Sequence, residues 1–312
     1  MSKINIVLFG CRKITVDIID HVIQNYGGES PIVGVIAHDE ERDRVYGKKL
    51  VAEHCNELKI PCFRFDNKID KKTIEDLKPD LIFSSYYRKI LKQEVLDIPK
   101  MGCINIHPAM LPFGRGPAPS LWNVLNGDSF AGSTIHYMIE AVDAGDIINQ
   151  KQISIDGMTG FQLNERLMTV GLELFKENFE NILQGTNQRI PQNHSEAIYT
   201  IQFRQSLRHI YWEMPDRVIN QIRAFAKPFD GAIASTINGE SIIVWAAAKL
   251  DCRTSFKAPG FFEVTKDGIL VQTCADTILI TEWENKNAGL AQKGRFVTTP
   301  ILLDDLYAGE VK

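Results

Sequence analysis

Residues 4–10, Ile-Asn-Ile-Val-Leu-Phe-Gly, form an apolar run that predicts a buried strand ending at a glycine. The next segment, Ile14–Tyr26, places its apolar residues at the spacing of one helical face. Pro31–Ala37 then contains the run Ile-Val-Gly-Val-Ile-Ala, which indicates a second buried strand. A strand, a helix and a strand in this order are typical of a parallel sheet, because parallel strands need a crossover connection.

The alternation of strands and helices continues up to residue 107. Further strands are expected at Pro61–Phe65, Leu81–Ser84 and Cys103–His107, and further helices at Lys48–Leu58, Lys71–Lys78 and Gln93–Ile98. The pattern predicts an α/β fold with a Rossmann-like parallel sheet covered by helices on both faces. Ligands of such sheets bind beyond the carboxyl ends of the strands.

Two common nucleotide-binding loops are missing from this sheet. The loop after the first strand, Gly10–Thr15, has only the first glycine of the Gly-x-Gly-x-x-Gly turn. The sequence also lacks the Gly-x-x-x-x-Gly-Lys-Ser/Thr loop that cradles phosphates. An NAD enzyme and a P-loop enzyme are therefore both disfavoured.

The pattern changes in the second half of the chain. A strand at Ser133–Ile139 and a long helix at Gly160–Leu183 precede the polar stretch Gly185–His194. A helix at Arg217–Ala226 comes next, followed by short alternating runs with turn signals at Asn238-Gly239 and Asp267-Gly268. We expect a catalytic domain at 1–190, a linker at 191–205 and a small β-rich domain at 206–312, built as an open, OB-like barrel.

Composition excludes several classes of protein. The 312 residues, 44% hydrophobic and 24% charged, are typical of a globular chain of about two domains. A net charge of −4 gives no general attraction to nucleic acid or to anionic membranes, and no run is long enough to span a membrane. The first strand is too short for a signal peptide, so a cytoplasmic protein is expected. Six scattered cysteines without a Cys-x-x-Cys pair predict reduced thiols and no metal site.

Candidate catalytic residues gather around the segment Gly102–Pro119. Asn105 and His107 are two residues apart near the end of an apolar strand, so both side chains point to the same face. Asp143 lies downstream in a turn that contains Gly145. The three residue types suit acyl transfer to an amine. The histidine handles the amine proton, the asparagine amide stabilises an oxyanion, and the aspartate orients the imidazole and favours its charged form.

Four motifs in this order resemble the formyltransferases that use 10-formyltetrahydrofolate: Asn105-x-His107, Leu111-Pro112, Arg115-Gly116 and Asp143-Ala-Gly145. The resemblance extends over nearly the whole chain, and the segment 217–232 resembles the start of the family's C-terminal domain. It implies that Asn105, His107 and Asp143 are catalytic and that 10-formyltetrahydrofolate is the formyl donor. It implies no metal.

The resemblance also implies a set of folate contacts. The stretch from Tyr86 to Leu91 resembles the loop that cradles the pterin, and Ala109–Pro112 resembles the family's Ser-Leu-Leu-Pro turn, with Ala109 and Met110 as departures. The implied cofactor-binding residues are Tyr87, Lys89, Ile90, Leu91, Leu111, Pro112, Ile139, Glu140, Ala141, Val142 and Asp143.

The acceptor separates two branches of this family, which formylate methionyl-tRNA or amino sugars attached to nucleotides. The tRNA enzymes have a basic insertion after the second strand, whereas residues 38–49 here have four acidic and four basic residues. Tyr46-Gly47, Ser85–Arg88 and Asn123–Gly127 most resemble the formyltransferase half of the enzyme that processes UDP-4-amino-arabinose. Pro117 departs from it, because an arginine follows Arg-Gly there. An amino-sugar nucleotide, linked to UDP, dTDP or GDP, is therefore the expected acceptor.

Alternatives stay open at this point. Methionyl-tRNA is the second acceptor, and nucleic acid is otherwise not expected as a partner. A silent module that only binds a nucleotide sugar is the alternative from another class.

Residues 38–49 can equally be a solvated loop, and His136 can be structural or line the site. Four arginines could form a phosphate-binding patch or scattered surface pairs: Arg204, Arg208, Arg217 and Arg223. Three tryptophans could stack on a base or pack in a core: Trp212, Trp245 and Trp283. A homodimer is also open.

Overall fold

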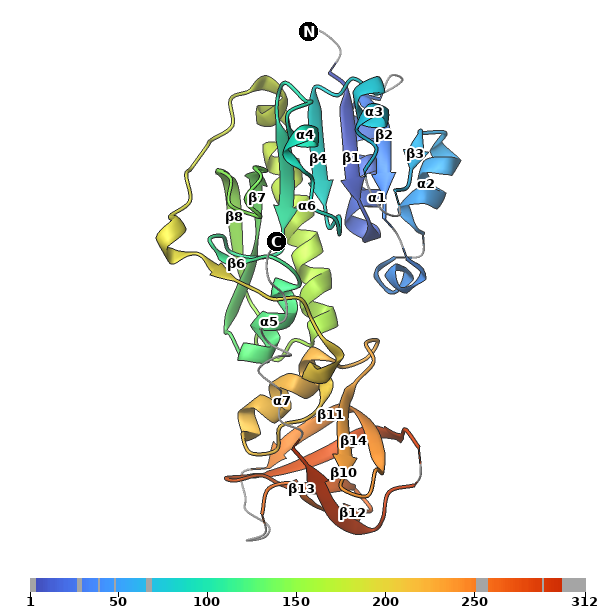
Figure 1. The fold of residues 1–312 in the computed structure, drawn as a ribbon, viewed down its shortest axis with the longest axis vertical. Helices are drawn as coiled ribbons and strands as arrows, with labels where there is room; N and C mark the ends of the chain where they lie inside the picture. The colour runs from blue at the N-terminus through green and yellow to red at the C-terminus, as the bar shows by residue number, and fades with distance from the viewer. Residues whose placement is uncertain are drawn as a thin grey trace. The chain divides into compact units, whose positions relative to one another are not determined.

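The chain forms two compact units, each assembled from segments that are not continuous in sequence (Figure 1). The computed structural model describes residues 4–26, 30–38, 40–47, 49–65, 69–250, 258–287 and 289–298. The first unit contains the chain up to residue 116 together with 131–153 and 165–199. The second unit contains 117–130, 154–164 and the chain from residue 200 onward.

A seven-stranded sheet with the order β3-β2-β1-β4-β5-β7-β8 forms the centre of the first unit. The strands from β3 to β5 are parallel, whereas β7 pairs antiparallel with β5. The sheet is therefore mixed at one edge, an arrangement common in doubly wound folds. The strands are β1 (Ile6–Gly10), β2 (Ile32–Ala37), β3 (Cys62–Phe63), β4 (Leu81–Ser85), β5 (Cys103–His107), β7 (Phe130–Tyr137) and β8 (Ile147–Ser154).

The strand order reverses between β1 and β4, where Gly10 pairs with Ser85. A Cβ atom on Gly10 would lie 2.2 Å from the Thr15 hydroxyl and 2.8 Å from the Ser85 carbonyl oxygen. The first glycine of the loop is thus required by close packing rather than by a nucleotide. Ligands of open α/β sheets bind at such a reversal.

Helices cover both faces of the sheet, as the alternation of strands and helices predicts. Phe83 packs on Phe175 of α6 with ring centroids 4.8 Å apart, while its neighbour Ile82 faces the cluster formed with α3 and α4. This alternation follows from the period of two along a strand. The helices are α1 (Arg12–Tyr26), α2 (Val51–Leu58), α3 (Lys71–Asp76), α4 (Gln93–Leu96) and α6 (Gly160–Gln184).

Residues 40–47 are not a simple solvated loop, because they contain the short helix η1 (Glu41–Tyr46) with a buried carboxylate. Asp43 is 3% exposed and accepts hydrogen bonds from the Glu40 backbone at 2.9 Å and from Arg88 at 2.5 Å. Arg12 lies 3.3 Å from the same carboxylate. Burial alone would raise the pKa of Asp43, but these hydrogen bonds and the two guanidinium charges hold it below its usual value.

A closed barrel forms the core of the second unit, with the order β10-β11-β14-β13-β12-β15. The sequence predicts an open barrel, and the difference comes from β15, which pairs with both β10 and β12 and so closes the ring. Both predicted hairpin turns are present, between β10 and β11 and between β12 and β13. The strands are β10 (Ala232–Thr236), β11 (Ser241–Leu250), β12 (Phe261–Thr265), β13 (Gly268–Gln272), β14 (Thr277–Asn285) and β15 (Lys293–Val297).

The second unit also contains two helices, α5 (Pro119–Asn126) and α7 (Pro215–Ala224). Helix α7 packs against β11 of the barrel, and α5 packs against α7. Arg223 of α7 donates to the Met158 carbonyl at 2.9 Å, and a Cβ atom on Gly160 would lie 2.4 Å from the Ala224 carbonyl oxygen. These contacts explain why 154–164 clusters with the second unit. The predicted fold class, a Rossmann-like α/β domain followed by a small β-rich domain, is confirmed.

Asp43 yields a prediction about stability. Asp43→Asn should lower the free energy of unfolding by about 3 kcal/mol at pH 7, because two partly buried guanidinium groups lose a buried carboxylate partner. The pKa of Asp43 is lower in the folded chain than in the unfolded chain, where it is about 3.9. The contribution is thus complete above that value and disappears as the pH falls through the folded-state pKa.

Urea unfolding of the full chain at several pH values measures this contribution. Glu41→Gln, on the same short helix but 79% exposed, is the matched control. It should change the stability by less than about 0.5 kcal/mol. Equal losses for the two variants would contradict the prediction.

Candidate active site

Asn105 and His107 occupy the carboxyl end of β5 and point to the same face of the sheet, as predicted. His107 is 6% exposed, and its Nε2 atom lies 2.8 Å from the carbonyl oxygen of Gly114. The intervening residue, Ile106, points to the opposite face, where it faces Gly171 of α6. The core face of β5 therefore fixes the register that presents both polar side chains.

Asp143 is brought to this strand by the turn between β7 and β8. Its backbone is left-handed, with φ +51°, and Gly145 follows in a position where a Cβ atom would lie 2.1 Å from the Tyr137 carbonyl oxygen. The Gly116 backbone N–H donates to Asp143 Oδ2 at 2.9 Å. Asp143 Oδ2 then lies 3.6 Å from His107 Nδ1, which is within ion-pair distance but too long for a good hydrogen bond.

His136 of β7 completes the cluster. It is 1% exposed, its Nδ1 lies 2.8 Å from the Tyr137 carbonyl oxygen, and its Nε2 lies 3.3 Å from Asn105 Nδ2. The pKa of His136 is lowered to about 4, chiefly because burial disfavours the charged ring; Asp143 acts in the opposite direction, and His107 contributes to the lowering. The neutral ring must donate from Nδ1, so its Nε2 accepts from the Asn105 amide. One amide hydrogen of Asn105 is thereby oriented.

The structure adds two polar residues that the sequence analysis did not select for the site. Arg115, 2% exposed, donates from Nε and a terminal nitrogen to Gln192 Oε1 at 3.1 and 2.7 Å. Gln192 Nε2 donates in turn to the carbonyl oxygens of Asp143 and Gly145, at 2.9 and 2.7 Å. Gln192 lies in the expected linker, whose polar composition carries no signal that would distinguish it.

The expected folate contacts lie in different surroundings. Ile139, Glu140 and Ala141 are exposed in the turn before Asp143, and Val142 is half-buried. Leu91 and Leu111 are buried, and Ile90 is 65% exposed. Lys89 donates its ammonium group to the Phe65 carbonyl oxygen. Pro112 follows Leu111, and its carbonyl oxygen accepts from the Ile198 backbone.

Tyr87, another of these residues, offers a test of fit for a folate. Its ring packs edge-on against Phe9, with centroids 5.1 Å apart, and against His38 at 5.7 Å. Its hydroxyl oxygen is buried and has no hydrogen-bond partner within the part of the chain that the structure describes. Such a group is costly to leave unpaired, so it fits a ligand that brings a polar atom to the end of the β1 strand.

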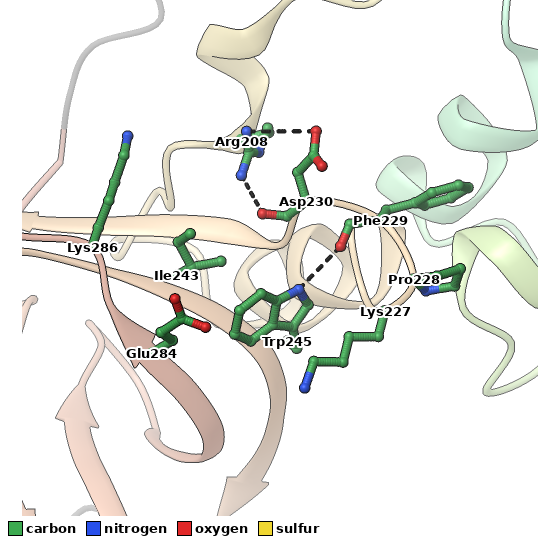
Figure 2. Close-up of a pocket in the computed structure, with 9 residues that line it drawn as sticks. All are labelled: Arg208, Lys227, Pro228, Phe229, Asp230, Ile243, Trp245, Glu284 and Lys286. Atoms are coloured by element: carbon green, nitrogen blue, oxygen red, sulfur yellow. Dashed lines mark hydrogen bonds and ion pairs between the residues drawn. The ribbon is translucent and has the colours of Figure 1, made fainter. Parts of the chain in front are cut away.

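A separate hollow of about 520 Å³ lies on the barrel of the second unit (Figure 2). The Trp245 indole N–H donates to the Phe229 carbonyl oxygen at 3.0 Å, and the Lys227 ammonium lies 4.6 Å from the Trp245 ring centroid. Arg208 donates to the carbonyl oxygen of Gly231 at 2.7 Å. It also donates to the carbonyl oxygen of Asp230 and lies 4.0 Å from the Asp230 carboxylate (Figure 2). Arg208 and Lys227 therefore already have partners within the protein.

The other arginines, tryptophans and cysteines named from the sequence do not gather at one place. Arg217 lies over the Tyr211 ring and Arg223 binds the Met158 carbonyl, so each contacts a different neighbour. Trp212 is fully buried in the barrel core and Trp283 is packed against it. Among the residues described, five cysteines are not in disulfide bonds, namely Cys11, Cys55, Cys62, Cys103 and Cys274, and Cys252 lies outside them.

No helix in the described ranges is sufficiently long and apolar to cross a membrane. No group of three or more His, Cys, Asp or Glu side chains in those ranges could hold a metal ion.

Solved structures share the fold. A sugar 3N-formyl transferase, WlaRD, determined with dTDP and 5-N-formyl-THF, superposes with a TM-score of 0.70 over 93% of this chain and 100% of its own, at 21% identity. An N-formyltransferase from Helicobacter canadensis, in complex with folinic acid and dTDP-3-aminofucose, gives 0.71 over 89% and 99%, also at 21% identity.

Sequence comparison identifies the family. Methionyl-tRNA formyltransferase of Clostridioides difficile (strain 630) is 32% identical over 311 residues, which cover 96% of this chain and 99% of that protein. The corresponding protein of Desulforamulus reducens is 36% identical and covers 73% of both chains. The formyl transferase family profile matches residues 3–178, and the profile of the formyl transferase C-terminal domain matches 202–292. The chain therefore belongs to the formyl transferase family.

Proposed function

We propose that this enzyme transfers the formyl group of 10-formyltetrahydrofolate to a primary amine at the cluster of Asn105, His107 and Asp143. The single observation that carries the proposal is the meeting of these three side chains at the end of β5, with His107 3.6 Å from the Asp143 carboxylate. Bound 10-formyltetrahydrofolate supplies the formyl carbon that the amine attacks. The unpaired Tyr87 hydroxyl and the exposed turn at 139–141 are available to contact it.

Each of the three residues has one task in this proposal. His107 takes the proton that the amine loses on forming the new C–N bond, and returns a proton to the departing folate nitrogen. Asp143 favours the charged imidazole between these two events. Asn105 donates its free amide hydrogen to the formyl oxygen as that atom gains negative charge. His136 keeps the Asn105 amide turned so that a donor is available.

The acceptor that we favour is the amine of an amino-sugar nucleotide. Support comes from the charges of residues 40–49, the segment where a basic insertion would meet tRNA. Arg42 pairs with Glu40 at 2.6 Å and Arg44 with Glu53 at 2.5 Å, and Lys49 pairs with Glu57. These cations are offset by carboxylates, so the segment offers little attraction to a polyanion.

Methionyl-tRNA is the second candidate acceptor. Its support is the 32% identity to a methionyl-tRNA formyltransferase over nearly the full length of both chains. Both candidates present a primary amine to the same three side chains. The choice of acceptor therefore leaves the proposed chemistry unchanged.

A direct assay separates the two acceptors. The full chain is incubated with 10-formyltetrahydrofolate and a panel of UDP-, dTDP- and GDP-linked amino sugars, with methionyl-tRNA in a parallel reaction. Mass spectrometry detects the gain of one formyl group. Formylation of the tRNA alone would reverse the ranking, and no formylation of any amine would contradict the proposed function.

His107→Asn should lower kcat by about 100-fold or more, in line with the usual contribution of an acid–base group. Folate binding, measured by calorimetry, should change little, because asparagine keeps a polar side chain at the end of β5. His209→Asn, a substitution of the same type in the second unit, is the control and should keep its turnover. Normal turnover in His107→Asn would remove this residue from the mechanism.

His136 should remain neutral throughout the pH range in which the enzyme works. Nitrogen NMR of labelled histidine should show a ring protonated at Nδ1 that takes up its second proton only near pH 4. His136→Leu should reduce kcat by about tenfold to a hundredfold, since the Asn105 donor loses its orientation. A ring that titrates near pH 6.5 would show that His136 does not act as the acceptor for Asn105.

Salt dependence provides an independent test of the acceptor. An amino-sugar nucleotide carries two phosphates, so its Michaelis constant should change far less between about 50 and 200 mM salt than binding of a polyanion would. We also expect no measurable complex with bulk tRNA at about 150 mM salt. The measurements are a kinetic salt series and a titration of labelled methionyl-tRNA. Tight tRNA binding at the higher salt would favour the second candidate.

A further inference from the structure

Gln192 occupies a buried position that connects two loops of the active site. It is 6% exposed and uses both ends of its side-chain amide. The carbonyl end accepts from the Arg115 guanidinium, and the amino end donates to the carbonyl oxygens of Asp143 and Gly145.

These contacts complete a closed ring of hydrogen bonds. Gly116 follows Arg115 in the chain, and its N–H binds the Asp143 carboxylate at 2.9 Å. The Arg115 side chain binds Gln192, and Gln192 returns to the Asp143 backbone at 2.9 Å. The Arg115-Gly116 loop therefore holds both parts of Asp143. It binds the side chain directly through the Gly116 N–H, and it binds the backbone through Gln192.

The backbone conformation of Asp143 sets the position of its carboxylate. Its φ of +51° is in the left-handed region, where aspartate is one of the few residues besides glycine that are found regularly. A change in this conformation would move the carboxylate relative to His107 Nδ1, which is only 3.6 Å away. Misplacement of a reacting group by about 1 Å can reduce a rate by as much as 100-fold.

We infer that Gln192 is a positioning residue, which acts on formyl transfer by fixing the turn that presents Asp143 to His107. The inference rests on the proposed role of Asp143. It assigns a function to the segment between the two family profiles, which end and begin at residues 178 and 202. Three residues of this segment, Gln192, His194 and Tyr199, contact the Arg115 guanidinium.

Gln192→Glu tests the two ends of the side-chain amide separately, because it keeps the acceptor and removes the donors. A glutamate of the same length still accepts from Arg115, with a stronger, charge-assisted pair, so the melting temperature should stay close to that of the wild type. It loses both N–H donors and faces two carbonyl oxygens with a carboxylate oxygen, so the turn loses its support. We expect kcat to fall by about 10- to 100-fold with little change in the donor KM.

Gln188→Glu is the matched control, because it makes the same charge change at an exposed glutamine of the same segment. Gln192→Met removes both ends of the amide and should lower the melting temperature as well as kcat. Equal turnover of Gln192→Glu and Gln188→Glu would overturn the inference. Loss of melting temperature in Gln192→Met without loss of kcat would also overturn it, since the role would then be structural.

A double-mutant cycle tests whether Gln192 acts through Asp143. The variant Gln192→Glu with Asp143→Asn should be no slower than Asp143→Asn alone, because the residue to be positioned is already disabled. Losses that multiply would overturn the inference. Wild-type turnover in Asp143→Asn would overturn it too, while the His107→Asn result would still decide the proposed function.

A readout that needs no activity distinguishes the two proposals. The ring NMR signals of His107 and His136, which both lie 3.6 Å from the Asp143 carboxylate, should move in Gln192→Glu and stay in place in Gln188→Glu. Unmoved signals would overturn the inference whatever the substrate of the enzyme. Moved signals in an enzyme that formylates no amine would support the positioning role and contradict the proposed function.

Discussion

The site depends on one constraint, the placement of a carboxylate on a left-handed turn beside the end of a parallel strand. Asp143 is held by the Gly116 N–H and lies between two imidazole rings, 3.6 Å from each. The close approach of Gly145 to the Tyr137 carbonyl makes the turn tight enough to reach β5. Without this turn, Asn105 and His107 would remain two polar residues at the end of a strand.

The two histidines of the cluster are buried, and Asn105 and Asp143 are partly buried, so each polar group depends on its neighbours. His136 is 1% exposed and stays neutral because desolvation disfavours its charged form. The neutral ring has a fixed tautomer, since its Nδ1 faces a carbonyl oxygen, and it can therefore orient the Asn105 amide. The Arg115 guanidinium also has fixed partners, since it donates hydrogen bonds to Gln192 and Tyr199. Fully paired polar networks of this type specify a unique arrangement.

A second charged cluster lies at the same edge of the sheet, since β1, β4 and β5 are parallel. Asp43 joins Arg12 and Arg88 across the carboxyl ends of β1 and β4, where the strand order reverses. The surface arginines of the same segment pair with nearby carboxylates. Surface pairs contribute little to stability, but they offset the positive charge that a nucleic acid would need. This bears on the acceptor rather than on the reaction.

Local pattern was sufficient for much of the fold. Apolar runs such as residues 4–10 and the helical spacing of Ile14–Tyr26 reveal strands and helices that bury one face, and the structure has them at β1 and α1. The short helices α5 and η1 and the strands β8 and β15 were not predicted. The two strands have polar sequences, Ile-Ile-Asn-Gln-Lys-Gln-Ile-Ser and Lys-Gly-Arg-Phe-Val, and form because neighbouring strands complete their hydrogen bonds. The two helices are only eight and six residues long, so their periodic pattern is weak.

The sequence by itself determined the parallel strand–helix architecture and the placement of Asn105 and His107 on one face, since both depend on residues that are near one another in the chain. It also carried the family resemblance, which depends on the order of short motifs along the chain. Only the tertiary structure decided that Asp143 and His136 reach these residues, that Asp43 is buried, and that Gln192 belongs to the site. The physical reason is that these contacts join residues 27 to 77 positions apart, and a hydrogen bond across such a distance leaves no periodic signal in the sequence.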